Sequence, residues 1–196
     1  MSGNRLLEFV QRMTRLVEQR PIAEEQLLEQ AAPLMRELVS HDDWLPGTMA
    51  VPDTRYYQQH LLYGDPLDRF SLVSFVWGPG QKTPIHDHTV WGIIAMLRGA
   101  ECARRFSRDS RGALVADANE EQLAPGDLDL VSPSIGDIHQ VRNAFDDRVS
   151  ISIHLYGGNI GRIERHAYSP DTGVAKPFVS GYSNTLVPNL WARNEA

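Results

Sequence analysis

The segment Pro84-Ile85-His86-Asp87-His88 holds two histidines two residues apart, and this spacing constrains the fold more than any other feature of the chain. Residues i and i+2 share a face only in an extended strand, because successive strand side chains alternate between faces. A third histidine, His139, ends the later segment 136–139. Three imidazoles on neighbouring strands would form a metal site, so the pattern predicts β structure and metal binding together.

The sequence around these histidines is typical of a β-rich protein. Short apolar or alternating runs are separated by Gly, Pro, Asp and Asn, which punctuate strands. The expected strands are 59–63, 70–77, 83–87, 92–97, 101–106, 121–123, 128–131, 139–143 and 149–155. Many short strands at this spacing indicate a sandwich or barrel. We therefore predict a mainly β, jelly-roll-like barrel over about residues 55–156.

Residues 1–40 are expected to form a helical cap on this barrel. Apolar residues between Leu6 and Val17 recur at three- and four-residue spacing, as in an amphipathic helix. A second helix should start near Pro21, and Pro33 should end it or open a third short helix. Residues 157–196 are rich in Gly, Pro, Ser and Asn and should wrap the barrel, so the 196 residues fit a single domain.

Charge and composition restrict the partners of the chain. A net charge of −6 gives no long-range attraction to nucleic acid or anionic membranes, so an anionic substrate needs a local cationic group. No run approaches the roughly 18 apolar residues of a membrane span, and the charged N-terminus does not resemble a signal peptide. The single cysteine, Cys102, suits a reducing compartment. We expect a cytoplasmic protein, for which a homo-oligomer is compatible with the sequence.

Glycines frame both histidine segments at characteristic distances. The first motif runs Gly80, five residues, His86-Asp87-His88, three residues, Gly92, six residues and Gly99. The second contains Gly126, Pro133, Gly136, His139 and Asn143. In this order the two motifs resemble the two cupin signatures, although a glutamate usually stands where this chain has Gly92. The resemblance implies a cupin barrel in which His86, His88 and His139 bind the metal.

The triad by itself does not choose the metal. Three neutral imidazoles leave the positive charge of the ion uncompensated and leave coordination positions open. Such a shell suits iron, nickel, copper or zinc. Zinc held by three histidines is a known hydrolytic arrangement.

Ser152, His154 and Tyr156 form a second pattern, spaced by two residues so that they share one strand face. The apolar residues between them occupy the other face. Periodicity does not say which face is inside, and the pattern alone favours a half-buried strand with a solvated polar face.

Together these segments resemble the thiol dioxygenases of the cupin superfamily, which include cysteine dioxygenase and 3-mercaptopropionate dioxygenase. The resemblance implies that the three histidines bind Fe(2+), and that a substrate thiolate and O2 react there to give a sulfinic acid. It also implies that Ser152, His154 and Tyr156 form a relay beside the iron, with Tyr156 as the proton or hydrogen-bond donor.

Two positions narrow the expected substrate. Mammalian-type cysteine dioxygenase holds the substrate carboxylate with an arginine and crosslinks a cysteine to the active-site tyrosine, but this chain has Gln59 and Gly92 at those positions. Both departures resemble the bacterial 3-mercaptopropionate dioxygenases, in which an arginine beyond the tyrosine binds the carboxylate. Spacing from Tyr156 assigns that role to Arg165, with Arg162 as the alternative.

We therefore expect a thiol dioxygenase acting on 3-mercaptopropionate or a similar thiol carboxylate. The alternatives are a cysteine dioxygenase acting on L-cysteine and a non-catalytic metal-binding cupin. Among the remaining residues, Cys102 is expected in the core and His41 and His166 at the surface. His60 falls in a segment that faces the site in this family, and its role is left open.

Overall fold

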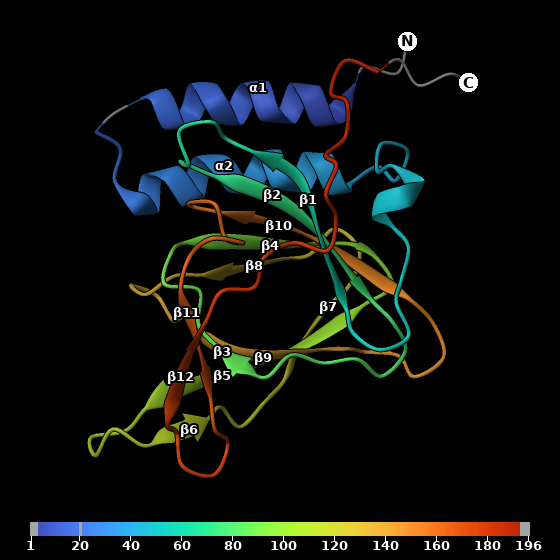
Figure 1. Cartoon of the computed structure of the whole chain (residues 1–196). Helices are drawn as coiled ribbons and strands as arrows, with labels where there is room; N and C mark the ends of the chain where they lie inside the picture. The colour runs from blue at the N-terminus through green and yellow to red at the C-terminus, as the bar shows by residue number, and fades with distance from the viewer. Residues whose placement is uncertain (1–3, 20, 193–196) are drawn as a thin grey trace.

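Two helices lie over one β-sheet, and a second sheet closes the barrel beneath it (Figure 1). This computed structural model describes residues 4–19 and 21–192. The helices are α1 (Arg5–Glu18), α2 (Glu24–Val39) and the short 3-10 helix η1 (Gly47–Met49). The strands are β1 (Gln58–Gly64), β2 (Ser71–Trp77), β3 (Ile85–His86), β4 (Gly92–Arg98), β5 (Glu101–Arg108), β6 (Leu114–Ala116), β7 (Glu121–Leu123), β8 (Leu128–Val131), β9 (Ile138–Asn143), β10 (Ser150–Tyr156), β11 (Arg165–Tyr168) and β12 (Ala175–Phe178).

The strands form two antiparallel sheets. The first has the order β1-β2-β10-β4-β8, and the second has the order β12-β11-β3-β9-β5-β6, with β7 also paired to β5. The predicted mainly β barrel with N-terminal helices is confirmed. Each predicted strand has a counterpart, although the strand predicted over 83–87 shortens to the two residues of β3.

The helices cover the outer face of the first sheet. The apolar stripe of α1, from Leu6 to Val17, is buried together with the inward face of α2. Both pack in one core cluster with Ile151, Ile153 and Leu155 of β10. Because side chains alternate along a strand, the polar residues between these three must point into the barrel.

The prediction that Pro33 would end the second helix or open a third short helix is wrong. Helix α2 begins at Glu24 and continues through Pro33 to Val39. Pro33 itself is exposed, whereas Ala31 and Met35 on either side are fully buried. A proline inside a helix costs about 3 kcal/mol, and burial of the apolar side chains around it offsets that cost.

The C-terminal segment contains strands that the sequence analysis does not predict. Strand β11 pairs with β3, with Ala167 opposite His86, and β12 extends the same sheet. The chain then turns back along β1, where the Ser183 amide donates to the Gln59 carbonyl over 2.8 Å. Strand β6 is also unpredicted. The C-terminal segment thus completes one wall of the barrel.

Among the described residues, no helix is long and apolar enough to cross a membrane.

Candidate metal centre

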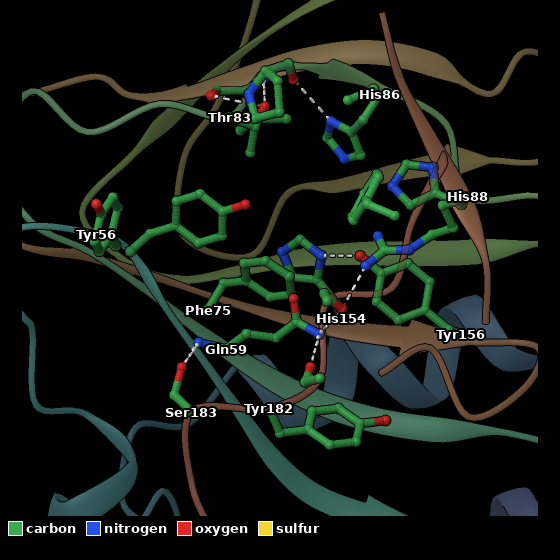
Figure 2. Close-up of a pocket in the computed structure, with 18 of the residues that line it drawn as sticks. Tyr56, Gln59, Phe75, Thr83, His86, His88, His154, Tyr156, Tyr182 and Ser183 are labelled. Atoms are coloured by element: carbon green, nitrogen blue, oxygen red, sulfur yellow. Dashed lines mark hydrogen bonds between the residues drawn. The ribbon is translucent and has the colours of Figure 1, made fainter. Parts of the chain in front are cut away.

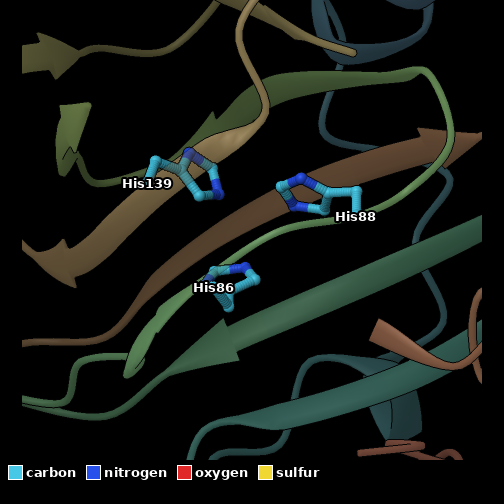
Figure 3. A group of neighbouring side chains, drawn as sticks. All are labelled: His86, His88 and His139. Carbon is cyan, nitrogen blue, oxygen red and sulfur yellow. The ribbon is translucent and has the colours of Figure 1, made fainter. Parts of the chain in front are cut away.

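The three predicted histidines meet inside the barrel (Figure 3). His86 on β3 lies directly opposite His139 on β9, and His88 follows β3 by two residues. All three are buried, and one nitrogen from each lies within 4.8 Å of the others. The ring centroids are 4.8 to 5.0 Å apart. The structure therefore brings together three nitrogens that could hold one metal ion.

Hydrogen bonds to neighbouring groups leave the inner nitrogens free. His86 donates from Nδ1 to the Pro84 carbonyl over 3.1 Å, and His88 donates from Nδ1 to Asp137 Oδ1 over 2.9 Å. His88 Nε2 is buried and finds no hydrogen-bond partner among the described residues. A buried polar atom without a partner is costly, and a metal ion would satisfy this nitrogen. The donor set thus fits a metal.

Burial also keeps these rings in the form that binds metal. It lowers the pKa of His86 to about 3 and holds the pKa of His139 well below its usual value, with the charges of neighbouring histidines adding to the effect. Metal ligation requires neutral imidazole. His86 and His139 therefore need no deprotonation at neutral pH before they bind an ion.

Asp137 orients His88 from the loop before β9. Besides the Nδ1 bond, its Oδ2 accepts hydrogen bonds from the backbone amides of His88 and Thr89 at 3.0 and 2.9 Å. Although burial opposes ionisation, these bonds lower the pKa of Asp137. Asp137 is not among the predicted site residues, although a carboxylate two residues before a ligand histidine is a signal that could have indicated it.

We expect Asp137→Asn to weaken metal binding about 10- to 100-fold, because groups that orient a ligand histidine typically contribute that much. The amide would keep the size of the side chain but lose its charge and one acceptor. Competition of the metal-free protein with a coloured chelator for Fe(II) measures the effect. Asp171→Asn, at an exposed position, is the control. Equal affinity in Asp137→Asn and wild type would contradict the assigned role.

Ser152, His154 and Tyr156 form a hydrogen-bonded chain on the inner face of β10. Ser152 Oγ lies 2.8 Å from His154 Nε2, and His154 Nδ1 lies 2.8 Å from Tyr156 Oη. All three side chains are buried, so the solvated-face interpretation is wrong. The packing of the opposite face of β10 under the helices decides this, and single-strand periodicity could not. The ring centroids of Tyr156 and His88 are 5.5 Å apart, which places the hydrogen-bonded residues beside the histidine triad.

Burial fixes the protonation of this chain as well. It raises the pKa of Tyr156, so the hydroxyl keeps its proton at neutral pH. It holds the pKa of His154 well below the usual value, so the imidazole is neutral. A neutral imidazole has one N–H and one acceptor nitrogen. His154 can therefore pass a proton between Ser152 and Tyr156 without carrying a charge at rest.

Gly92 lies against the ring of Tyr156. A Cβ at position 92 would come within 2.9 Å of Tyr156 Cδ1 and 3.0 Å of Val131 Cγ2. Real side chains essentially never approach so closely, so the position of the Tyr156 ring requires a residue without a side chain. The glycine that replaces the expected glutamate and cysteine therefore also makes room for the tyrosine.

One cavity of about 390 Å³ joins the triad to the hydrogen-bonded chain (Figure 2). Its wall includes Gln59, Phe75 and Tyr182, together with His154 and Tyr156. The size suits a small molecule, and the mixture of aromatic walls with a few polar groups is typical of ligand sites.

Arg165 reaches this cavity from the first position of β11. It is 3% exposed, donates from Nη2 to Ser180 Oγ over 2.7 Å and lies over the Phe178 ring. It forms no ion pair with any described residue, and its Nε is buried without a partner. Arg162, the alternative, is exposed and does not line the cavity. The structure thus places one buried, uncompensated cation beside the triad.

Gln59 lines the same wall and is engaged with the C-terminal segment. Its Nε2 donates to Ser180 Oγ and to the Gly181 carbonyl, both over 3.1 Å. Ser180 therefore connects Gln59 to Arg165. Sequence reasoning missed Ser180, because nothing local to a serine in an irregular segment indicates that it returns to the barrel.

The remaining candidates lie outside the cavity. His60 is buried on the opposite face of β1 from Gln59, Cys102 is buried on β5, and His41 is exposed. His166, expected at the surface, is half-buried, and its Nδ1 bonds Asp87 over 2.9 Å. Asp87 also accepts 2.6 Å from the Tyr168 hydroxyl, so it holds the histidine motif to β11.

Fold and site define a β-barrel protein with a buried three-histidine metal centre. Residues 5–169 match the family described as cysteine dioxygenase type I. The match covers most of the chain, and the chain belongs to the cysteine dioxygenase type I family.

Individual relatives share part of this sequence. The chain is 29% identical over 107 residues to cysteine dioxygenase type 1 of Homo sapiens, covering 54% of the chain and 52% of the relative. The corresponding enzyme of Rattus norvegicus is 28% identical over the same length. The chain therefore spans about half the length of the curated relatives it matches.

Two solved structures are also similar to the chain. A double-stranded β-helix protein from Klebsiella pneumoniae subsp. pneumoniae covers 61% of this chain and 88% of its own, with 15% identity and a TM-score of 0.46. A cupin 2 domain-containing protein from Halorhodospira halophila covers 67% and 81%, with 17% identity and a TM-score of 0.45.

Proposed function

We propose that this protein is a non-haem iron(II) thiol dioxygenase that converts a small thiol carboxylate to its sulfinic acid with O2. The observation that carries the proposal is a single cavity lined by three histidines, by Tyr156 with its partner His154, and by a buried arginine, with Ser152 behind His154. The family to which the chain belongs depends on non-haem iron. Iron held by His86, His88 and His139 would supply a binding position for the thiolate and the electrons that activate O2.

The residues of the chain would orient the substrate around that centre. A neutral histidine set leaves the charge of the metal available for an anionic thiolate. Arg165 can grip a carboxylate with its planar fork, where the net charge of −6 offers no attraction. Tyr156, held by His154, would present its hydroxyl to the reacting atoms, and aromatic side chains such as Phe75 and Tyr182 form part of the surrounding wall.

Within this reaction we assign 3-mercaptopropionate, or a thiol acid like it, as the substrate. Gln59 uses its amide nitrogen to hold the C-terminal segment and carries no charge. A single fixed cation, Arg165, suits a ligand whose only charged group besides the thiolate is one carboxylate. The second candidate is L-cysteine, which the names of the curated relatives favour.

Oxygen uptake across a panel of thiols tests the proposal. Protein with verified iron occupancy should oxidise 3-mercaptopropionate with a higher kcat/KM than L-cysteine, cysteamine or mercaptosuccinate. A preference for cysteine would support the second candidate and overturn the substrate assignment. Full iron occupancy with no uptake from any of the four would instead indicate a non-catalytic metal-binding cupin.

We expect Arg165→Ala to raise the KM for 3-mercaptopropionate about 10- to 100-fold, because hydrogen bonds to charged groups contribute about 1.5–3 kcal/mol. Cysteamine has no carboxylate, so its KM should change little. Steady-state oxygen uptake with both thiols measures the difference. Arg162→Ala removes an exposed arginine three residues away and should behave like wild type. An equal rise for both thiols would show that Arg165 does not bind the carboxylate.

A further inference from the structure

Glu101 is a buried acid that the proposed site does not use. It is the first residue of β5, it is 1% exposed, and it does not line the cavity. The turn before it is fixed to β10, where the Ala100 amide donates to Ser150 Oγ over 3.1 Å. This contact brings Glu101 to the end of the hydrogen-bonded chain that lies farthest from Tyr156.

Ser152 connects this acid to the chain. The Ser152 hydroxyl and the Trp77 indole N–H both lie beside the Glu101 carboxyl and favour its ionised form, and Trp77 Nε1 also donates to Ser152 Oγ over 3.1 Å. Glu101 Oε2 has no hydrogen-bond partner among the described residues. The buried carboxyl therefore has an acceptor oxygen that no described group satisfies.

The surroundings of Glu101 make it titrate near neutral pH. Burial is the main cause that raises its pKa to about 7, and Asp129 on β8, itself paired with Arg105, adds to the rise. Uncharged groups face it from the other strands, namely Trp77 on β2, Leu123 on β7, Asn143 on β9 and Ser152 on β10. Tyr156 keeps its proton at this pH, so Glu101 is the group of this network that changes charge.

The hydrogen bonds among Tyr156, His154 and Ser152 leave the Ser152 hydroxyl in need of a further acceptor. If Tyr156 donates to His154 Nδ1, then Nε2–H donates to Ser152 Oγ, which also accepts from Trp77. The Ser152 hydroxyl must then donate its hydrogen to another acceptor, and the Glu101 carboxylate lies beside this hydroxyl. In the reverse orientation Ser152 donates to His154, and only a protonated Glu101 can bond to Ser152.

We propose that Glu101 is the inner end of the hydrogen-bonded chain of Tyr156, His154 and Ser152, and that it stores the proton that an entering thiol releases. A thiol must lose its proton to bind a metal. The S–H bond breaks and its proton passes to Tyr156 Oη, while the Tyr156 proton passes to His154 Nδ1. The Nε2 proton of His154 passes to Ser152, and the Ser152 proton passes to Glu101. A thiolate and a carboxylic acid result, and no electrons are transferred.

After the proton transfer, the direction of the hydrogen bond between His154 and Tyr156 also suits the oxidation that follows. His154 now donates to Tyr156 Oη, so the tyrosine hydroxyl points into the cavity as a hydrogen-bond donor. When the sulfinate leaves, water in the open cavity can take the proton back by the reverse transfers. Glu101 acts through Ser152 and touches no substrate, so it is a positioning residue. Its use in catalysis rests on the proposed thiol oxidation. Its link to Ser152 does not depend on that function.

Infrared titration of the metal-free protein tests that link directly. Wild type should lose a carboxylic-acid carbonyl band with a midpoint near pH 7, and Glu101→Gln should lack this band. Ser152→Ala removes a hydroxyl that favours the ionised carboxylate, so the midpoint should move to higher pH. Glu121→Gln, at an exposed position of β7, should leave the band unchanged. A midpoint that Ser152→Ala does not move, or a band that survives in Glu101→Gln, overturns the proposal.

The pH profile of the iron-loaded enzyme then tests its use. For wild type, kcat/KM should rise as pH increases through about 7, because the carboxylate is the form that accepts a proton. Glu101→Gln should lose this ionisation and at least about 10-fold in rate, with iron content unchanged. Wild-type turnover with an identical profile in Glu101→Gln overturns the inference alone. Absence of wild-type turnover overturns the proposed function, and the infrared titration still decides whether Glu101 is linked to Ser152.

Discussion

His86→Ala should lose its iron and all measurable thiol-dependent O2 uptake. Two histidines cannot hold the ion on one face, and the loss should exceed the roughly 10- to 100-fold effect of groups that only orient a ligand. The Nδ1 bond to Pro84 fixes the His86 ring with its other nitrogen toward His88 and His139. Iron per chain after gel filtration and oxygen uptake with 3-mercaptopropionate measure the two losses.

His41→Ala is the matched control, because it removes an exposed histidine outside the cavity. It should keep wild-type iron content and wild-type turnover. Melting temperatures of the metal-free proteins separate loss of the ligand from loss of the fold. Full iron content in a folded His86→Ala protein would contradict the assignment of the metal site.

Tyr156→Phe should retain iron and slow thiol oxidation about 10²- to 10⁴-fold, the usual contribution of a positioned proton-transfer group. The phenylalanine ring keeps its place against Gly92 and beside His88, so the metal site should be undisturbed. What disappears is the hydroxyl 2.8 Å from His154 Nδ1, and with it the connection between relay and cavity. Single-turnover oxidation of 3-mercaptopropionate measures the rate.

Tyr63→Phe provides the comparison, since Tyr63 on β1 does not line the cavity. That variant should oxidise thiols at the wild-type rate. A Tyr156→Phe rate within a factor of about three of wild type would remove the hydroxyl from the mechanism.

Local spacing predicts much of this fold and site. Ser152, His154 and Tyr156 share one face of β10 because residues two apart on a strand lie on the same side. His86 and His88 have the same spacing, although β3 itself ends at His86. These patterns depend only on backbone geometry within one strand, so they survive without knowledge of the rest of the molecule.

The features that depend on distant contacts were not predictable in this way. Which face of β10 is inside depends on helices more than a hundred residues earlier in the sequence, which cover Ile151 and Ile153. Strand β11 is defined by its pairing with β3, and its own sequence has no apolar alternation. Helix α2 tolerates Pro33 because burial on either side outweighs the local cost.

Of the buried residues Arg165 and Glu101, the sequence indicated the first but not the second. Arg165 could be selected over Arg162 by spacing from Tyr156, and the structure buries Arg165 and exposes Arg162. Glu101 gave no signal, because a glutamate at the start of a strand is ordinarily exposed. Its position next to Ser152 follows from the packing of the β4–β5 turn against β10.

Isotope labelling tests the central claim most directly. Iron-loaded protein that oxidises 3-mercaptopropionate under ¹⁸O2 should give a sulfinate whose mass shows both oxygen atoms derived from O2. A product that carries no label, or conversion of the thiol to its disulfide alone by fully iron-loaded protein, would contradict the assignment as a thiol dioxygenase.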